Sequence, residues 1–422
     1  MKITVLFKRT MLACLISGLY LSVPSFAQTN AENINQGQVG LLNSQSMDLG
    51  NSTGGSQGKA KVNAKNINQS QVGLLNSQKM EIGSANSGKS NVNASNVNQG
   101  QAGLLNSQEM TIGNAGKGGS SKVSVSNVQQ GQVGLLNSQK MAVGNAGRGK
   151  SDVSSGPIMQ GQAGLLNNQE MNLGSVSGTG SSKVRTGVVM QGQVGLLNNQ
   201  QMNVGGSSGS GKTNVAVGAV MQGQAGLLQN QTMNIGTASG KGSSNVKMGA
   251  AIQGQAGLLN NQQMEIGNAS GSGKSNVMMG AAVQGQAGLL NNQQMKVGNA
   301  SGSGKSNVIA GAVVQGQAGL LNNQQLEIGN ASGSGRSNVA VGAVVQGQAG
   351  LLNNQQAKIG NASGGTSNVA VGAVIQGQAG LLNSQQLNVG NASSGSTNVV
   401  TGAIVQGGGG MLNVQKINIG NN

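Results

Sequence analysis

The sequence predicts an all-β fold: a β-solenoid of about thirteen strand-arch-strand repeats of 30–31 residues with cross-β-like stacking. First, the motif Gln-Gly-Gln-(Ala/Val)-Gly-Leu-Leu-Asn recurs in thirteen copies at spacings of 30 to 33 residues. Second, fixed and variable positions alternate with period two inside each copy, which is typical of a strand with one buried face. Third, beyond an N-terminal segment the chain has no aromatic residue, Cys or His, so ordinary compact cores are not expected.

Residues 1–27 are predicted to be a cleaved secretory signal peptide. Basic residues precede an apolar stretch at 11–23, and small residues precede Gln28. That stretch is too short to cross a bilayer core of about 30 Å. The only Cys, Cys14, lies inside it. Removing 27 of the 422 residues leaves a secreted chain of 395 residues, and its net charge falls from +16 to +13 because three basic residues are lost.

The strand that follows the Leu-Leu pair has the clearest pattern. Gln262, Met264 and Ile266 alternate with variable polar residues, and the Met264 position is Met in nine copies and otherwise Leu, Ala or Ile. Thioether sulfur suits Cu(I), but replacement by Leu, Ala or Ile favours a packing role over a metal site. The predicted core column comprises Met264, Ile266, Met295, Val297, Leu326 and Ile328.

The rest of each repeat completes one turn of the solenoid. In a representative copy we expect a strand at residues 277–286, an arch at 287–291 and a Gly/Ser-rich loop at 299–307. No linker divides the repeats, so residues 28–422 are predicted to form a single array. Pro157 removes a ladder donor in the fifth copy, and Gly408 and Gly409 alter the last; these are predicted weak points or brakes on assembly.

Amide side chains occupy positions that an ordinary core would not tolerate. Stacked one rung apart, however, each amide can donate to one neighbour and accept from the other, as in Asn and Gln ladders. We therefore predict a stacking ladder made of Gln253, Asn260, Gln262, Gln284, Asn291, Gln293, Gln315, Asn322 and Gln324.

The hexapeptide Gln-x-Gly-x-x-Asn, as at Gln255 to Asn260, resembles the strand-turn-strand core of curli-type (curlin-like) repeats, the secreted bacterial functional-amyloid subunits of biofilm matrix. The match is partial, because the flanking Ser and Gln of the curlin pattern are replaced here by apolar residues or Gly. The resemblance implies export through the outer membrane of a Gram-negative-like bacterium, with templated fibre growth outside the cell.

Consecutive Leu residues point to opposite faces of an extended strand. Unless the arch turns both inward, one Leu per rung is expected to be exposed, and a column of such residues would form an apolar association surface. The candidate lateral-association stripe comprises Leu258, Leu259, Leu289, Leu290, Leu320 and Leu321.

Basic residues recur in the inter-repeat loops, where stacking would align them along one edge: Lys89, Lys212, Lys274, Lys305 and Arg336. Such an edge could adhere to anionic surfaces, polysaccharide or extracellular DNA, or could simply keep the protein soluble. Residues 83–90, 144–151 and 206–213 fit the phosphate-loop formula. No helix is expected after them, so we interpret these matches as chance.

These observations favour a secreted structural protein, extracellular or at the cell surface, that polymerises with itself into amyloid-like fibres. We expect no catalysis, no cofactor, no metal and no specific small molecule; secretion and nucleation factors are possible further partners. The alternative is a monomeric repeat adhesin or surface stalk that binds anionic surfaces or polysaccharide through its basic loop face. An ice- or crystal-binding solenoid is disfavoured because no regular Thr-x-Thr array occurs, and disorder is disfavoured by the in-phase apolar columns.

Overall fold

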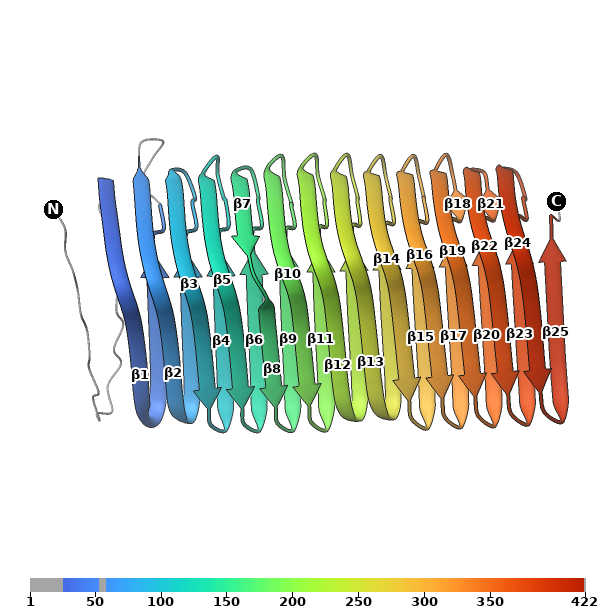
Figure 1. Ribbon diagram of the computed structural model, residues 1–422, viewed down its shortest axis with the longest axis horizontal. Coiled ribbons are helices and arrows are strands. Elements are labelled where there is room, and N and C mark those ends of the chain that lie inside the picture. The colour runs from blue at the N-terminus through green and yellow to red at the C-terminus, as the bar shows by residue number, and fades with distance from the viewer. Residues whose placement is uncertain (1–25, 53–57, 421–422) are drawn as a thin grey trace. The chain divides into compact units, whose positions relative to one another are not determined.

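The computed structural model describes residues 26–52 and 58–420, and within them it contains strands and no helix (Figure 1). The predicted β-solenoid is confirmed: parallel strands stack with a repeat of about 31 residues, each on the equivalent strand of the next copy. Residues 1–25 of the predicted signal peptide lie outside the described residues, and β1 begins at Phe26.

The chain divides into two compact units. The first comprises the residues up to Met202 together with Thr213–Gly218, and the second comprises Asn203–Lys212 and the residues from Ala219. Strands of the first unit are β1 (Phe26–Leu49), β2 (Lys59–Ile82), β3 (Lys89–Ala102), β4 (Leu105–Ile112), β5 (Ser120–Val133), β6 (Leu136–Val143), β7 (Lys150–Ser155), β8 (Ile158–Ala163), β9 (Leu166–Leu173) and β10 (Ser181–Val194). Strands β11 (Leu197–Val204) and β12 (Lys212–Ile235) have residues in both units.

The second unit continues the pattern. Its strands are β13 (Ser243–Ile266), β14 (Lys274–Ala287), β15 (Leu290–Val297), β16 (Lys305–Ala318), β17 (Leu321–Ile328), β18 (Ala331–Ser332), β19 (Arg336–Ala349), β20 (Leu352–Ile359), β21 (Ala362–Ser363), β22 (Thr366–Ala379), β23 (Leu382–Val389), β24 (Ser396–Gly409) and β25 (Leu412–Ile419). One strand-arch-strand layer, such as β14 with β15, is called a rung below.

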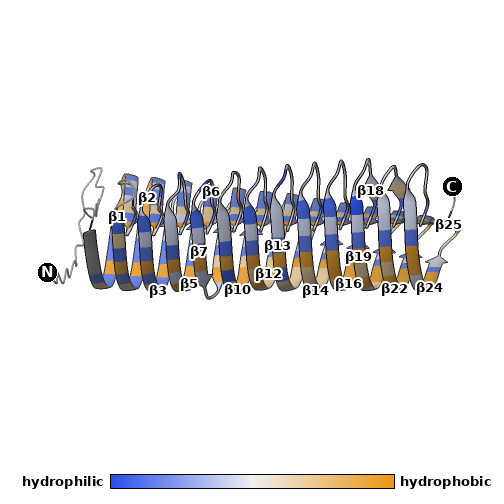
Figure 2. Cartoon of the chain, turned by 90° about the horizontal axis from the view of Figure 1, so that it is seen from above, coloured by the Kyte–Doolittle hydropathy of each residue, from blue (hydrophilic) through white to orange (hydrophobic). Residues whose placement is uncertain are grey.

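Stacking within each unit is in register, so identical positions of successive copies lie side by side. Gln284 of β14 pairs with Gln315 of β16, and Met295 of β15 pairs with Leu326 of β17. Bands of similar hydropathy therefore cross neighbouring strands at the same height (Figure 2). Every sequence position thus becomes a column of like residues one rung apart, at the strand spacing of about 4.8 Å.

The first strand of each rung is longer than predicted and changes phase. Strand β14 starts at Lys274 rather than at residue 277, and β16 starts at Lys305, inside the expected loop 299–307. Those loop residues join the ladder because the Ser306 hydroxyl donates to the Gly267 carbonyl, and Asn307 Nδ2 donates to Asn276 Oδ1 at 2.8 Å. In β14, Ser275, Val277 and Met279 are buried, followed by Ala282, Gln284 and Gln286. The buried face therefore shifts by one residue at Gly280–Ala281.

Two local features follow from this geometry. Gly298 turns the chain out of β15 with φ of 68°, a left-handed conformation that favours Gly. Pro157 lies at the phase change of its rung, where the first strand is split into β7 and β8. The strand is therefore interrupted at the predicted position, next to a place where the alternation already breaks.

Candidate assembly surfaces

The predicted Gln ladders are present in the buried face of the rungs. Gln253, Gln284 and Gln315 are at most 1% exposed, and each Nε2 donates to the Oε1 of the preceding rung at 2.8 to 2.9 Å. The second column behaves in the same way: Gln293 donates to Gln262 at 3.0 Å, and Gln324 donates to Gln293 at 3.1 Å. Buried amides are thus satisfied by their own copies along the stacking direction.

The predicted Asn ladder runs in the opposite direction and also fastens the arch. Asn291 Nδ2 donates to Asn322 Oδ1 of the following rung at 2.9 Å, and Asn260 donates to Asn291 at 2.9 Å. The same Asn291 amide lies 3.2 Å from the Gly288 carbonyl of its own arch and 2.9 Å from the Ala318 carbonyl of the next. Asn at this position therefore links two consecutive arches as well as two side chains.

A third Gln ladder was not predicted. Gln286 Nε2 donates to Gln255 Oε1 at 2.8 Å, and Gln317 donates to Gln286 at 2.9 Å; all three residues are about 5% exposed. The signal was available, because both Gln residues of the Gln-Gly-Gln motif recur in copy after copy and lie two residues apart on one strand face.

The ladders fail where the repeated residue changes. Gln229 replaces the arch Asn, and its longer side chain still donates to the carbonyls of Gly226 and Ala256. However, Gln229 Oε1 and Asn260 Oδ1 are buried without a hydrogen-bond partner. Near the C-terminus, Gly408 replaces Gln, and Gln378 Oε1 is likewise left unpaired. These unpaired oxygens show that a buried amide is fully hydrogen-bonded only where the neighbouring rung repeats the same residue.

The predicted core column is confirmed. Met264, Ile266, Met295, Val297, Leu326 and Ile328 are all at most 1% exposed. The chain thereby builds its core without aromatic rings, using aliphatic residues and adaptable Met. Burial alongside aliphatic replacements in the same column supports packing as the role of Met.

The Leu-Leu pair differs from the expectation of one exposed Leu per rung, because both residues are exposed. Leu258, Leu289 and Leu320 are each 44% exposed, and Leu259, Leu290 and Leu321 are each 41% exposed. The reason is the arch, which turns at this pair so that neither side chain lies on an inward-facing strand position; burial resumes at the Asn that follows. Within each unit the result is a stripe two Leu wide that no described segment covers.

Basic residues align as predicted. Lys274 pairs with Lys305 and Lys305 pairs with Arg336 at the start of their strands, all three exposed. In the first unit, Lys59 pairs with Lys89 in the same column. Like charges one rung apart repel, so this column costs stability unless counterions or an anionic partner screen it.

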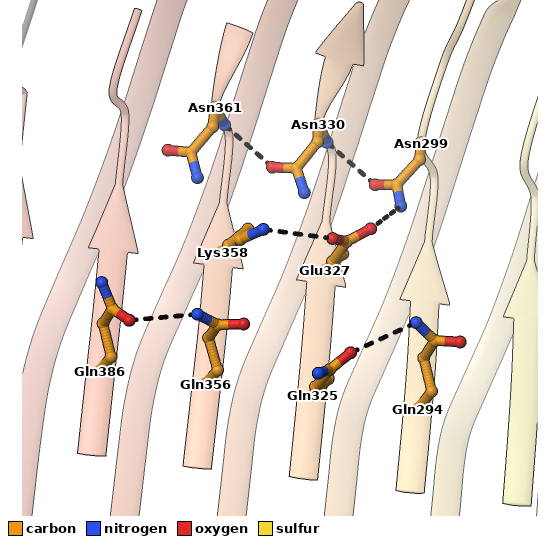
Figure 3. Close-up of polar contacts among 9 residues, drawn as sticks. All are labelled: Gln294, Asn299, Gln325, Glu327, Asn330, Gln356, Lys358, Asn361 and Gln386. Carbon is orange, nitrogen blue, oxygen red and sulfur yellow. Dashed lines mark hydrogen bonds and ion pairs between the residues drawn. The ribbon is translucent and has the colours of Figure 1, made fainter. Parts of the chain in front are cut away.

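Oppositely charged columns lie on the outer face of the second strand. In the first unit Lys79, Glu109, Lys140 and Glu170 succeed one another on consecutive rungs, and in the second unit Glu265, Lys296, Glu327 and Lys358 do the same. The Lys–Glu distances are 3.7 Å for Lys140–Glu170 and Lys296–Glu265 and 3.8 Å for Lys358–Glu327. Figure 3 shows the last pair with the outer Asn and Gln contacts between rungs. From the sequence, these outward positions are expected only to hold variable polar residues.

Another exposed pair joins β1 and β2. Lys65 Nζ lies 2.9 Å from Glu32 Oε1, and its hydrogen bond and positive charge lower the pKa of the Glu32 carboxyl. Asp152 lies in register between Lys122 and Lys183. Six of the eight acidic residues of the chain therefore have a basic residue on an adjacent rung.

The remaining sequence motifs lie in loops and strand starts. Lys89 and Lys212, the Lys residues of two of the phosphate-loop matches, are the first residues of β3 and β12, so each of these matches runs into a strand. In residues 26–52 and 58–420, no group of three or more His, Cys, Asp or Glu is placed to hold a metal ion. The same residues include no helix long and apolar enough to span a membrane.

Comparison with protein-family models, curated proteins and solved structures finds no significant match.

Proposed function

We propose that this chain is a secreted structural protein that self-assembles into extracellular amyloid-like fibres of a biofilm matrix or cell surface, without a catalytic role. The main support is that its buried amides are satisfied by copies of themselves: three Gln columns and one Asn column are hydrogen-bonded from rung to rung. A surface built this way fits another rung of the same sequence better than any unrelated partner. The resemblance to curli-type repeats points in the same direction.

The Leu stripe supports a second contact in this proposal, the lateral pairing of assembled chains. At the four positions that precede the arch Asn, equivalent to 287–290, the thirteen copies have only Ala, Val, Gly, Leu or Met. No charge therefore opposes apolar contact there. Each rung exposes two Leu side chains at the same spacing, and the stripe of another copy has the matching period. We propose that the stripes of two copies pack together.

Assembly kinetics test this function. The secreted chain from Gln28 should form fibres after a lag phase, detected by thioflavin fluorescence and electron microscopy, and preformed fibres should abolish the lag. Replacing Leu258, Leu289 and Leu320 with Ser should preserve monomer β-content but prevent bundling of fibres. Matched replacement of the outward-facing Met278 and Ile309 should leave bundling intact. A persistent monomer would contradict the function; unchanged bundles in the Leu variant would contradict the lateral contact alone.

The aligned basic column favours one further candidate, a monomeric adhesin that binds anionic polysaccharide. Lys274, Lys305 and Arg336 lie on consecutive rungs and are exposed. Binding of a sulfated polysaccharide by the monomer, weakened by salt and by replacing these residues with Gln, would favour this candidate. Secretion and nucleation factors remain proposals inferred from the curli-type resemblance.

A further inference from the structure

The buried Gln ladders have a direction, and this direction leaves different atoms unpaired on the β1 rung of the first unit and on the β24–β25 rung of the second. In the three buried Gln columns, Nε2 donates to the preceding copy: Gln69 donates to Gln36 at 3.1 Å, and Gln78 donates to Gln45 at 3.1 Å. At the other end, Gln406 donates to Gln376 at 2.6 Å. The Gln45 position of the β1 rung thus has an amide donor left over, and the Gln406 position of the β24 rung has an amide oxygen left over.

These leftover atoms are observed as unpaired groups. Gln45 is 2% exposed, and its Nε2 is buried without a hydrogen-bond partner. Gln406 Oε1 is also buried without a partner. An unsatisfied buried amide group costs about 1–3 kcal/mol, so both ends gain from a complementary rung.

Some apolar side chains of the end rungs are also incompletely covered. Ile34 on β1 and Ile404 on β24 belong to one column. Ile67, Val344 and Val374 of this column are fully buried, whereas Ile34 and Ile404 are partly exposed. On the last rung Met411 is 80% exposed and Leu412 is 64% exposed, well above the 41–46% of Leu in interior arches. The β24–β25 rung and the Ile34 position of β1 therefore expose surface that stacking buries elsewhere in the units, whereas Met47 and Leu49 of β1 are at most 3% exposed.

We infer that the β24–β25 rung of one copy docks in register on the β1 rung of a second copy, which makes growth head-to-tail and polar. This inference rests on the proposed self-assembly and adds the surface and its direction. In the docked pair, donors of the β1 rung meet acceptors of the β24–β25 rung. In the Gln columns, two β24–β25 rungs would oppose amide oxygens and two β1 rungs would oppose amide donors. The Asn column runs the other way, so it too continues only between unlike end rungs.

The docking surface contains one mismatch. Gly408 occupies the column of Gln286, so one of the three Gln ladders is missing at the junction. A Cβ at Gly408 would lie 3.2 Å from the flexible Gln415 Nε2, with ordinary backbone conformation. Gly408→Gln is therefore compatible with the rung. It should extend the third ladder from Gln378 to the last rung, lower the critical concentration for assembly and speed seeded elongation several-fold.

Two blocked variants test the direction. Ile34→Lys places a charge in the inward column of the β1 rung, and Ile404→Lys does so in the β24 rung. Each variant alone should remain monomeric where the unmodified chain assembles, and an equimolar mixture should form a discrete dimer in analytical ultracentrifugation. Val400→Lys, on the last rung but outward-facing and 63% exposed, is the matched control and should assemble normally. Circular dichroism checks that each variant keeps its β-content.

Each other outcome has a definite meaning. Dimers of Ile404→Lys alone would show pairing of two β1 rungs and overturn the inference, as would dimers of Ile34→Lys alone. Unimpaired assembly of both variants, or slower elongation of Gly408→Gln, would also overturn it while leaving self-assembly in place. Failure of the unmodified chain to assemble would instead overturn the proposed function. If a Lys variant does not fold, the Gly408→Gln kinetics decide.

Discussion

At the scale of single residues, buried polar side chains in this protein are hydrogen-bonded mainly by the equivalent residues of neighbouring repeats. Gln293 is buried, donates to Gln262 and to the Gly316 carbonyl, and accepts from Gln324, so its environment consists of other copies of its own repeat. In an ordinary core such an amide would need a partner designed for it. Here the same residue one rung away supplies it, which explains how a chain lacking aromatic residues in its repeats can still have an ordered interior.

A substitution in this column tests the residue-scale account. Gln293→Leu removes one amide and leaves Gln262 Oε1 and Gln324 Nε2 buried without that partner. We expect a loss of unfolding free energy of about 1–3 kcal/mol, mainly from the unpaired Gln262 Oε1, because Gln324 Nε2 still donates to the Gly347 carbonyl. Chemical denaturation measures it. Gln294→Leu, on the neighbouring half-exposed position, is the control and should change stability by less than about 0.5 kcal/mol; equal effects would argue against a structural ladder.

Two glycines of one repeat give a second test. Gly298 has a φ of 68°, and an added Cβ would lie 2.3 Å from Val339 Cγ2, whereas nothing lies within 4 Å of a Cβ at Gly285. Gly298→Ala should therefore destabilise the protein by more than about 1–2 kcal/mol, the cost of the left-handed backbone alone. Gly285→Ala should leave the stability nearly unchanged. Thermal unfolding of both variants measures the difference. Similar melting temperatures for the two variants would show that the turn is not fixed.

At the scale of the element, the second strand of each rung was predictable and the first only partly so. Fixed Gln262 and Met264 against variable Gln263 and Glu265 give an unambiguous phase. The first strand shifts phase at Gly280–Ala281, and residues this small carry no signal for which face is buried. Lys305, Ser306 and Asn307 have turn-like composition, yet they extend β16, because hydrogen bonds to other rungs outweigh local preference.

Among the candidate surfaces too, a column was predictable from the sequence where its residue is nearly constant among the copies. The amide and Met columns were predictable because their residues are nearly constant. Exposure of both Leu258 and Leu259 was not, because it depends on where the arch turns rather than on strand periodicity. The alternating charges were missed because they vary from copy to copy, and their order becomes meaningful only when the copies are read along the stacking direction.

These charge columns predict an effect on register. In the column of Lys79, Glu109, Lys140 and Glu170, skipping one rung would bring like charges together, so alternation disfavours that slip. Lys140→Glu should reduce stability by about 1 kcal/mol at low salt and by less at 1 M salt. Reversing all four charges restores alternation and should recover most of the loss in equilibrium unfolding. A salt-independent loss that the fourfold reversal does not recover would contradict electrostatic control.

At the scale of the whole molecule, we propose that the best partner of this chain is another copy of itself. Its ladders continue from rung to rung within each unit, its end rungs leave complementary amide groups unpaired, and its arches present uncharged Leu pairs. Self-assembly would use the same contacts that fold the chain, so folding and fibre growth should respond together to changes in the ladder columns.

Fibre diffraction from aligned assemblies of the secreted chain tests this central claim most directly. The account predicts a sharp meridional reflection near about 4.8 Å, because the strands of each rung lie across the stacking direction and copies continue that spacing. Fibres grown from seeds of this protein should show the same meridional reflection in the first round of seeding. A chain that folds with full β-content but sediments as a monomer at all concentrations, giving no oriented reflection, would contradict the claim and favour the adhesin.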